Sequence, residues 1–355
     1  MKKRILSVAL AAMVVTSLCA CGSTEAPAEA ATEVVEEATE AVEEVVEEVA
    51  EAVEEASEDV LGDAQYTIGI CQLVQHVALD AATEGFMDAC TAQLGDHVTF
   101  DLQNAAGDSA TCATIANQFV SSNVDLIMAN ATPPLQAAAA ATNEIPILGT
   151  SVTDYATALE ISDWTGVTGT NISGTSDLAP LADQAAMLKE LFPDATNVGL
   201  IYCSAEPNSQ YQCSVIAEEL AGYGYTTKDY TFADSNDIAS VVTQATSECD
   251  VLYVPTDNTA AANTEVINNI CLPAGIPVIA GEEGICAGCG VATLSISYYD
   301  LGYATGLMAA RILYGGEDVT SMPVEFAPQV TKKYNVANCE ALGITIPDDY
   351  VAIEE

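Results

Sequence analysis

Residues 66–94 read YTIGICQLVQHVALDAATEGFMDACTAQL, a short apolar run over 66–72 followed by an amphipathic helix pattern over 78–94. The same alternation continues along the chain. Further strand-like runs lie at 97–102, 124–130, 145–150, 197–203, 225–232, 250–255, 276–281 and 290–296, and helix patterns at 109–121, 177–191, 210–223 and 258–270. Short strands joined by helix-length connections form parallel sheets with right-handed crossovers, so the sequence predicts the α/β class.

A Gly/Thr/Ser-rich segment, residues 164–174 (WTGVTGTNISG), divides this series into two parts. Each part holds its own strand–helix units, and 355 residues suffice for two lobes of ordinary size. Paired α/β lobes bind a ligand between them, at the carboxyl ends of their strands. We therefore expect the binding site where the strand ends of both lobes meet.

The residues just after the predicted strands are hydroxyls, amides and carboxylates, with no nucleophile beside a base. Hydroxyls that precede helix N-termini hold a carboxylate together with free backbone N–H groups, and acidic groups suit an ammonium. A free amino acid needs both, so we expect an amino-acid ligand and no catalytic residue. The candidate ligand-binding residues are Thr132, Thr150, Ser151, Glu206, Asn208, Ser209, Asp257, Asn258 and Glu283.

Three of these candidates have alternative structural roles. Asp257 is the best partner for a ligand ammonium, but it is also placed to cap a helix that begins near Asn258. Thr150 and Ser151 are also ordinary turn residues. His76 and His97 are the only histidines in the sequence, so we expect neither a histidine-based metal site nor a cofactor.

The N-terminus has the features of an export signal. Lys2, Lys3 and Arg4 precede an apolar run over 5–18 that is too short to span a bilayer. Leu-Cys-Ala-Cys at 18–21 then resembles the bacterial lipobox. We predict a lipoprotein signal peptide over 1–20, lipid on Cys21 and attachment to the cell membrane on its extracytoplasmic face; the alternative is an ordinary signal peptide with incidental cysteines.

A highly acidic segment follows, and we assign residues 21–63 to it as a spacer. Residues 22–63 contain 16 Asp or Glu and no Lys or Arg. Val and Ala recur there at heptad spacing, which is typical of a coiled coil, but glutamates fill most other positions and repel one another. We interpret the segment as a solvated, partly helical spacer and keep the coiled coil as the alternative.

The charge of the whole chain excludes one class of partner. Lys and Arg number 8 against 52 Asp and Glu, so the formal net charge is −44. Such a surface repels phosphate backbones, and no basic patch offsets that repulsion. We expect no nucleic-acid partner.

The segment Ile68–Phe86 resembles the opening of one family of transporter proteins, and further segments match it in the expected order. The matching segments are GTSVTD at 149–154, VTGTN at 167–171, SAEPNS at 204–209, PTDN at 255–258 and YDLGYATG at 299–306. The chain is identified as a member of the ABC-transporter substrate-binding lipoproteins of the tryptophan/tyrosine uptake type. The resemblance covers about residues 66–350.

The resemblance implies a type I periplasmic-binding-protein fold: two Rossmann-like lobes with parallel sheets joined by a three-strand hinge. The first lobe would comprise 64–168 with 296–322, and the second 169–295 with 323–355. The helix over 300–313 would pack on the first lobe. An aromatic amino acid is the implied ligand, with Gln75 as a contact at a helix start and Leu79, Pro133 or tyrosines covering the ring. The implied partners are the subunits of an ABC-transporter permease.

One loop departs from the family pattern. Residues 282–289 (EEGICAGC) bring two carboxylates and two thiols where we expect a small, hydroxyl-rich loop, which favours a ligand with an extra cationic group. Cys286 and Cys289 stand as a CxxC pair, which leaves a local disulfide open. Cys71, Cys203 and Cys249 lie in or beside strand patterns, and Cys90 and Cys112 lie in helix patterns. We interpret these five as small buried hydrophobes.

Two other functions remain open at this point. The same fold binds sugars or nucleosides in some proteins, although such sites usually stack rings on several aromatic side chains and Trp164 is the only tryptophan. The other alternative is a surface enzyme that uses the loop of Glu283, Cys286 and Cys289. It would need a perturbed carboxylate or thiolate beside a base, and the sequence shows none.

Overall fold

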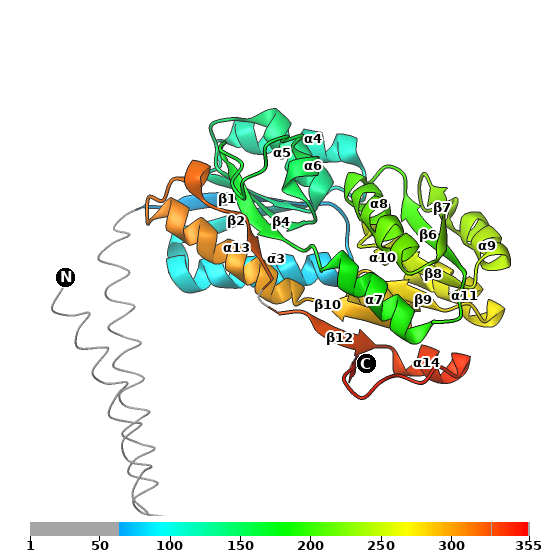
Figure 1. The fold of residues 1–355 in the computed structure, drawn as a ribbon. Coiled ribbons are helices and arrows are strands. Elements are labelled where there is room, and N and C mark those ends of the chain that lie inside the picture. Colours follow the sequence, from blue (N-terminus) through cyan, green and yellow to red (C-terminus); the bar gives the residue numbers. More distant parts are fainter. Residues whose placement is uncertain (1–63, 328, 354–355) are drawn as a thin grey trace, which may run out of the picture. The chain divides into compact units, whose positions relative to one another are not determined.

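Two sheets flanked by helices make up the part of the chain that the computed structural model describes, residues 64–327 and 329–353 (Figure 1). The first sheet has the order β11-β5-β4-β3-β1-β2, and all its strand pairs are parallel. Its strands are β1 (Tyr66–Gln72), β2 (Val98–Asn104), β3 (Leu126–Asn130), β4 (Ile147–Val152), β5 (Ile172–Ser176) and β11 (Glu325–Phe326). The first lobe is this sheet with α3 (Val77–Leu94), α4 (Ser109–Ser122), α5 (Thr132–Ala141), α6 (Tyr155–Ala158) and α13 (Tyr298–Leu313).

The second sheet has the order β13-β12-β10-β9-β8-β6-β7, with one antiparallel pair, β10 with β12. Its strands are β6 (Asn197–Cys203), β7 (Thr226–Phe232), β8 (Val251–Val254), β9 (Val278–Ala280), β10 (Ala292–Ser295), β12 (Thr331–Tyr334) and β13 (Val351–Ala352). The second lobe is this sheet with α7 (Leu181–Leu191), α8 (Pro207–Gly222), α9 (Ile238–Glu248), α10 (Asn258–Ala261), α11 (Thr264–Ala274), α12 (Glu283–Cys289) and α14 (Val336–Leu342). The predicted α/β class with two parallel-strand lobes is confirmed.

Burial on both faces explains why the central strands are continuous apolar runs. Every residue of β3, β4, β8 and β9 is buried. Separate apolar clusters cover the two faces of the first sheet, and the second sheet has two further clusters. Parallel sheets covered by helices on both sides require such runs, because neither face meets water.

Helix α13 completes the first lobe although it follows the second lobe in sequence, and Figure 1 shows it beside α3. The two backbones approach so closely that a Cβ at Gly302 would lie 1.9 Å from the carbonyl oxygen of Ala82, and one at Gly85 would lie 2.1 Å from that of Tyr299. Only glycine fits such an approach. The predicted packing of this helix on the first lobe is therefore confirmed.

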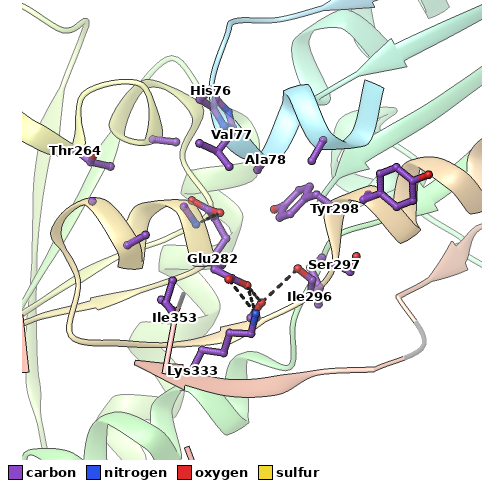
Figure 2. Close-up of a pocket in the computed structure, with 18 of the residues that line it drawn as sticks. His76, Val77, Ala78, Thr264, Glu282, Ile296, Ser297, Tyr298, Lys333 and Ile353 are labelled. Atoms are coloured by element: carbon purple, nitrogen blue, oxygen red, sulfur yellow. Dashed lines mark hydrogen bonds and ion pairs between the residues drawn. The ribbon is translucent and has the colours of Figure 1, made fainter. Parts of the chain in front are cut away.

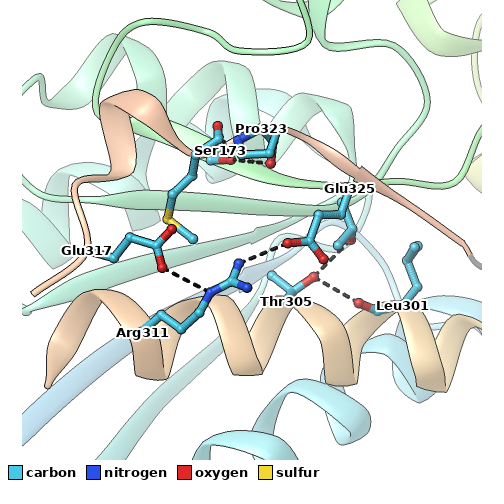
Figure 3. Close-up of polar contacts among 9 residues, drawn as sticks. Ser173, Leu301, Thr305, Arg311, Glu317, Pro323 and Glu325 are labelled. Atoms are coloured by element: carbon cyan, nitrogen blue, oxygen red, sulfur yellow. Dashed lines mark hydrogen bonds and ion pairs between the residues drawn. The ribbon is translucent and has the colours of Figure 1, made fainter. Parts of the chain in front are cut away.

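The chain passes between the two sheets three times, as the family resemblance implies: after β5, after β10 and between β11 and β12. The predicted lobe boundaries at 168/169 and 322/323 need correction. Strand β5 pairs with β4, and β11 pairs with β5, so both strands belong to the first lobe. Arg311 of α13 holds this end of the lobe together by pairing with Glu317 and Glu325 (Figure 3).

The predicted strands correspond to nine of the observed ones. The strands that were not predicted are β5, β11, β12 and β13; β5 reads ISGTS and β12 reads TKKY, so neither shows an apolar run. The predicted helix at 258–270 is two helices, because α10 ends at Ala261 and α11 begins at Thr264. The predicted signal peptide, the lipid site Cys21 and the acidic spacer lie outside the described residues.

Candidate functional site

The strand ends of both lobes meet at a cavity of about 10 Å³, which we call the enclosed cavity. The first lobe contributes His76, Leu79, Ser151 and Thr153, the second lobe Asn208, Thr256, Asp257, Asn258, Ala261 and Glu282, and the crossings Asp177 and Tyr298. This volume suits about one water molecule. A ligand of amino-acid size therefore enters only when the lobes separate or these side chains move.

A cavity of about 1060 Å³ lies beside it, and we call it the open cavity (Figure 2). Its walls come from the start of α3, from α10 and α12, and from the crossing that leads into α13. Small side chains dominate the facing walls, among them Ala78 on α3 and Ala262 next to α10. His76, Glu282 and Tyr298 line both cavities, so the two spaces adjoin.

Two buried carboxylates at the enclosed cavity keep capacity for a ligand. Asp177 accepts one hydrogen bond on each oxygen, from Thr153 Oγ1 (3.0 Å) and from Tyr298 OH (2.9 Å). Glu282 also accepts one on each oxygen, from backbone N–H groups at the start of α12. Burial raises the pKa of Asp177 and raises that of Glu282 to about 7. Because a carboxylate has about four acceptor sites, both can still accept an ammonium.

Asp257 is more fully engaged by the protein itself. Its Oδ1 accepts from the backbone N–H of Ala260 (2.8 Å) and so caps α10. Its Oδ2 accepts from the backbone N–H of Cys203 (2.7 Å) and from Ser209 Oγ (2.8 Å). Burial raises the pKa of this carboxyl, and the charge of Glu206 adds to the effect. The structure thus shows the capping role that the sequence offered as the alternative, at the edge of the enclosed cavity.

Two buried polar atoms that face the enclosed cavity have no hydrogen-bond partner: Ser151 Oγ and Asn208 Oδ1. Ser151 also adopts a φ of 53°, a left-handed conformation that costs free energy for a residue with a Cβ. An unsatisfied buried polar atom costs about 1–3 kcal/mol. These two atoms belong to residues of different lobes that line one cavity, so hydrogen-bond capacity is left unused on both sides of it.

The lobes contact each other across the site. His76 Nε2 of the first lobe lies 3.3 Å from Asn258 Oδ1 of the second. Gln212 Nε2 of α8 lies 3.5 Å from Thr153 Oγ1 of the first lobe. Burial lowers the pKa of His76, against smaller opposing effects of Asn258, Glu206 and Asp80. The neutral imidazole therefore favours this arrangement of the lobes.

The unusual loop of residues 282–289 divides its two carboxylates between different environments. Glu283 forms an ion pair with Lys333 Nζ (2.7 Å to Oε2) and accepts a hydrogen bond from Ser295 Oγ. Cys286 and Cys289 are buried free thiols, and burial raises the pKa of each well above its usual range. Such thiols are poor nucleophiles at neutral pH.

All ten cysteines from Cys71 to Cys339 are buried and free, as expected for small hydrophobes in the core. Among residues 64–327 and 329–353, no group of three His, Cys, Asp or Glu side chains is placed to hold a metal ion. No helix within the same residues is long and apolar enough to cross a membrane.

The structure separates the predicted ligand residues into three groups. Those at the enclosed cavity are Leu79, Ser151, Asn208, Asp257 and Asn258. Gln75 and Glu283 line the open cavity instead. Thr132, Thr150, Glu206 and Ser209 are buried and line neither cavity.

Two of these last residues support their neighbours instead. Glu206 accepts hydrogen bonds from the backbone N–H groups of Asn258 and Thr259, both at 2.9 Å. Thr150 Oγ1 lies 3.2 Å from Thr175 Oγ1 in the next strand.

The enclosed cavity also includes residues that the sequence reasoning did not select: His76, Thr153, Asp177, Thr256, Ala261, Glu282 and Tyr298. Asp177 follows β5, and a strand rich in Ser, Gly and Thr gave no signal. Glu282 stands directly after a predicted strand, so its position was visible in the sequence. Glu282, the first of the two adjacent glutamates at the start of α12, lines the enclosed cavity, and Glu283 does not.

The sequence profile of the family described as "ABC transporter substrate binding protein" matches residues 67–354. The chain belongs to this family. It is 36% identical over 263 residues to a tyrosine-binding protein of Clostridioides difficile, which covers 73% of this chain and 76% of that protein.

Two solved structures of substrate-binding proteins allow a comparison of the fold. One, of an ABC domain in complex with L-Trp from Streptococcus pneumonia, has a TM-score of 0.76 at 32% identity and covers 80% of this chain and 97% of that one. The other is the ligand-free, open form of a substrate-binding protein with adhesive properties from Clostridium difficile. It has a TM-score of 0.62 at 37% identity and covers 81% of this chain and 100% of that one. These likenesses confirm the type I periplasmic-binding-protein fold.

Proposed function

We propose that this substrate-binding protein captures an aromatic amino acid outside the cytoplasm and delivers it to the permease of an ABC transporter. The observation that carries the proposal is the enclosed cavity, where Ser151 Oγ and Asn208 Oδ1 lack partners beside two buried carboxylates. Hydrogen-bond capacity left unused on both lobes is what a ligand that draws the lobes together would satisfy.

The ligand ammonium is assigned to the space between Asp177 and Glu282. Both side chains are at most 4% exposed, and each oxygen still has a free acceptor site. Asn208 Oδ1 is a third acceptor for the same group, and the Ser151 hydroxyl is a donor for the ligand carboxylate. A buried charge needs a partner of opposite sign, and the ammonium provides it for these two carboxylates.

The aromatic ring is assigned to the side where the two cavities adjoin. Leu79 lines the enclosed cavity, and the open cavity next to it has small side chains on facing walls, with Ala81 on α3 and Ala261 on α10. Walls of this kind leave room for a flat ring between two helices. The relatives support an aromatic ligand, since one is named for tyrosine and another was solved with L-Trp.

The location of the protein is proposed from the sequence and the family. The basic residues, the apolar run and the Leu-Cys-Ala-Cys segment support export and a lipid on Cys21, with the acidic spacer between the lipid and the lobes. Capture closes the lobes about their three crossings and changes the face shown to the permease. ATP hydrolysis belongs to other subunits of the transporter.

Thermal unfolding of the full-length protein against the twenty amino acids, common sugars and nucleosides tests this proposal. A ligand at a hundred times its dissociation constant adds about 2.7 kcal/mol to the free energy of unfolding, which is readily measured. We expect tyrosine, tryptophan or phenylalanine to raise the midpoint and sugars and nucleosides to leave it unchanged. A shift produced by a sugar or nucleoside alone, or by none of these compounds, would overturn the proposal.

A further inference from the structure

The Glu206 side chain joins the two loops of the second lobe that carry the amides of the enclosed cavity. Its Oε1 accepts hydrogen bonds from the backbone N–H (2.9 Å) and the hydroxyl (2.8 Å) of Thr259. Its Oε2 accepts from the backbone N–H (2.9 Å) and Nδ2 (2.8 Å) of Asn258 and from Asn208 Nδ2 (3.3 Å). Glu206 is 3% exposed and lines neither cavity. It can therefore act on a ligand only through these neighbours.

The carboxylate decides which way the two amides point. Each of its oxygens accepts from a backbone N–H group, so it presents acceptors on both sides. The NH2 group of Asn258 must face it, because a reversed amide would place one oxygen 2.8 Å from another. The carbonyl oxygen of Thr256 holds the Asn208 amide in the same sense (3.0 Å). Both Asn Oδ1 atoms therefore point away from Glu206.

The orientation of Asn258 is passed to His76 across the lobes. Asn258 Oδ1 lies 3.3 Å from His76 Nε2. An amide oxygen only accepts, so Nε2 carries the proton. Burial lowers the pKa of His76, against smaller opposing effects of Asn258, Glu206 and Asp80, so the ring is neutral and Nδ1 is unprotonated. Glu206 thus selects, through Asn258, the tautomer of a first-lobe histidine that lines both cavities.

We propose that Glu206 is a positioning residue for ligand capture: it holds the Asn258 amide in the orientation that accepts a hydrogen bond from His76, and so holds the two lobes together over the ligand. This inference rests on the proposed function, because the contact closes the cavity assigned to the amino acid. A ligand enclosed between two lobes leaves only when they separate. Loss of the contact therefore lowers the affinity through a faster release.

Exchange of donor and acceptor between positions 206 and 258 tests the proposal. Glu206→Gln offers Asn258 a donor as well as an acceptor, so both amide orientations become possible. Asn258→Asp alone places a carboxylate oxygen against Glu206. Calorimetry and stopped-flow kinetics on the full-length protein use L-tyrosine and L-tryptophan. We expect each single variant to bind about tenfold or more weakly, with the change in the dissociation rate. The double variant, in which the new amide donates to the new carboxylate, should bind within about threefold of the wild-type protein.

Two control variants separate positioning from a merely structural role. Thr259→Val removes a hydrogen bond from the other oxygen of Glu206 and should lower the free energy of unfolding while changing the dissociation constant by less than about threefold. Glu218→Gln removes a charge from an exposed position of α8 and should change neither quantity. A loss of affinity in Thr259→Val equal to that in Glu206→Gln would overturn the proposal.

The two histidines of the sequence give a spectroscopic measure that does not depend on affinity. His97 Nδ1 lies 2.7 Å from the carbonyl oxygen of Ala64, so His97 carries its proton on Nδ1, whereas His76 carries it on Nε2. Long-range proton–nitrogen correlation spectra of protein with nitrogen-15-labelled histidine distinguish these tautomers. With and without ligand, Glu206→Gln should add the Nδ1–H form at His76, and the double variant should remove it. An unchanged His97 signal shows that the fold is intact.

The outcomes separate the inference from the proposed function. If the wild-type protein binds the amino acids and Glu206→Gln binds them equally well, the inference is wrong and the proposed function stands. The same holds if the double variant binds more weakly than both single variants. If neither amino acid binds the wild-type protein, the proposed function fails. The ligand-free spectra then decide the inference, because a His76 signal that is unchanged in Glu206→Gln overturns it and one that changes and is restored in the double variant supports it.

Discussion

The enclosed and open cavities adjoin, yet they treat acidic side chains in opposite ways. At the open cavity, Glu283 is neutralised by Lys333 and accepts a hydrogen bond from Ser295. At the enclosed cavity, Glu282 and Asp177 are buried, and no lysine or arginine of the described residues lines the wall. The difference teaches that a carboxylate paired within the protein contributes to the fold, whereas buried carboxyl groups without a charged partner support the proposed binding site.

The largest expected effect on ligand affinity comes from replacing each of the two adjacent glutamates with glutamine in turn. Glu282→Gln should weaken binding of the amino acid by about 100-fold, because removing one partner of a buried charge pair costs about 2–5 kcal/mol. Glu283→Gln should change the dissociation constant by less than about threefold, since its charge already has a partner. Calorimetric titration measures both, and circular dichroism checks the fold. Equal losses in the two variants would contradict the comparison.

The next effect is on pH dependence, through the Glu282 carboxyl, whose pKa is raised to about 7. A bound ammonium favours the ionised form, so binding releases a proton below pH 7. The affinity should then rise by up to about tenfold per pH unit between pH 5 and 7 and level off above that. Titrations in buffers of different ionisation enthalpy count the protons released. A flat profile for the wild-type protein would contradict the assignment, and Glu282→Gln should make the profile shallower, because Asp177, whose pKa burial also raises, still titrates.

The raised pKa of Glu282 also affects the ligand-free protein, whose free energy of unfolding should fall with rising pH while the ligand affinity rises. The folded protein keeps the proton of Glu282 above the ordinary pKa of 4.5, so its contribution to stability is present at low pH and is lost as pH rises towards about 7. The loss amounts to about 3 kcal/mol between these values. Denaturant unfolding should therefore show Glu282→Gln gaining stability over the wild-type protein across this range. A constant difference between the two proteins would disprove the shift.

Adjacent hydroxyls on β4 offer a smaller and more specific test. Ser151→Ala should weaken ligand binding by about tenfold and should not lower the free energy of unfolding, because the hydroxyl has no partner in the ligand-free protein. Thr150→Val is the matched control, since the Thr150 hydroxyl contacts Thr175 and lines neither cavity. It should cost about 1 kcal/mol of stability and leave affinity nearly unchanged. The reverse pattern would place the ligand elsewhere.

The smallest expected effect concerns the ion pair at the open cavity. Lys333→Met leaves Glu283 without its cation and should lower the free energy of unfolding by about 1 kcal/mol, since both side chains remain partly exposed. Combining it with Glu283→Gln should recover most of that loss. Urea denaturation of the four proteins completes the cycle. Additive losses would show that the pair contributes no coupling.

The strands of the fold were predictable where they are buried on both faces, because burial gives them an uninterrupted apolar sequence. Runs such as 124–130 and 197–203 are apolar because their strands are covered on both faces, and they were identified within a few residues. The sequence did not show β5 and β12, because β5 is a Ser/Gly/Thr-rich strand before a crossing and β12 is polar, so neither has such a run. The lobe boundaries shifted for the same reason, since both corrected crossings follow strands that the sequence did not show.

The site was predictable to the level of the strand ends. Ser151, Asn208 and Asn258 follow strands that were identified, and they line the enclosed cavity. The sequence could not distinguish Glu282 from Glu283, because the turn into α12 decides which side chain caps the helix and which reaches Lys333. Asp257 illustrates the same limit. An aspartate before a helix can cap that helix or contact a ligand, and the sequence pattern is the same for both roles.

The close packing of α13 on α3 has a consequence for biogenesis. The glycines that allow it, Gly85 and Gly302, are separated by the entire second lobe in the sequence. An exported chain emerges from its N-terminus, so the first lobe still lacks α13 and β11 when most of the second lobe has emerged. We expect the second lobe, which by then lacks only the short strands β12 and β13 and the helix α14, to become compact first. A chain truncated before residue 298 would leave the opposite lobe unfinished, with the apolar side of α3 uncovered and open to aggregation.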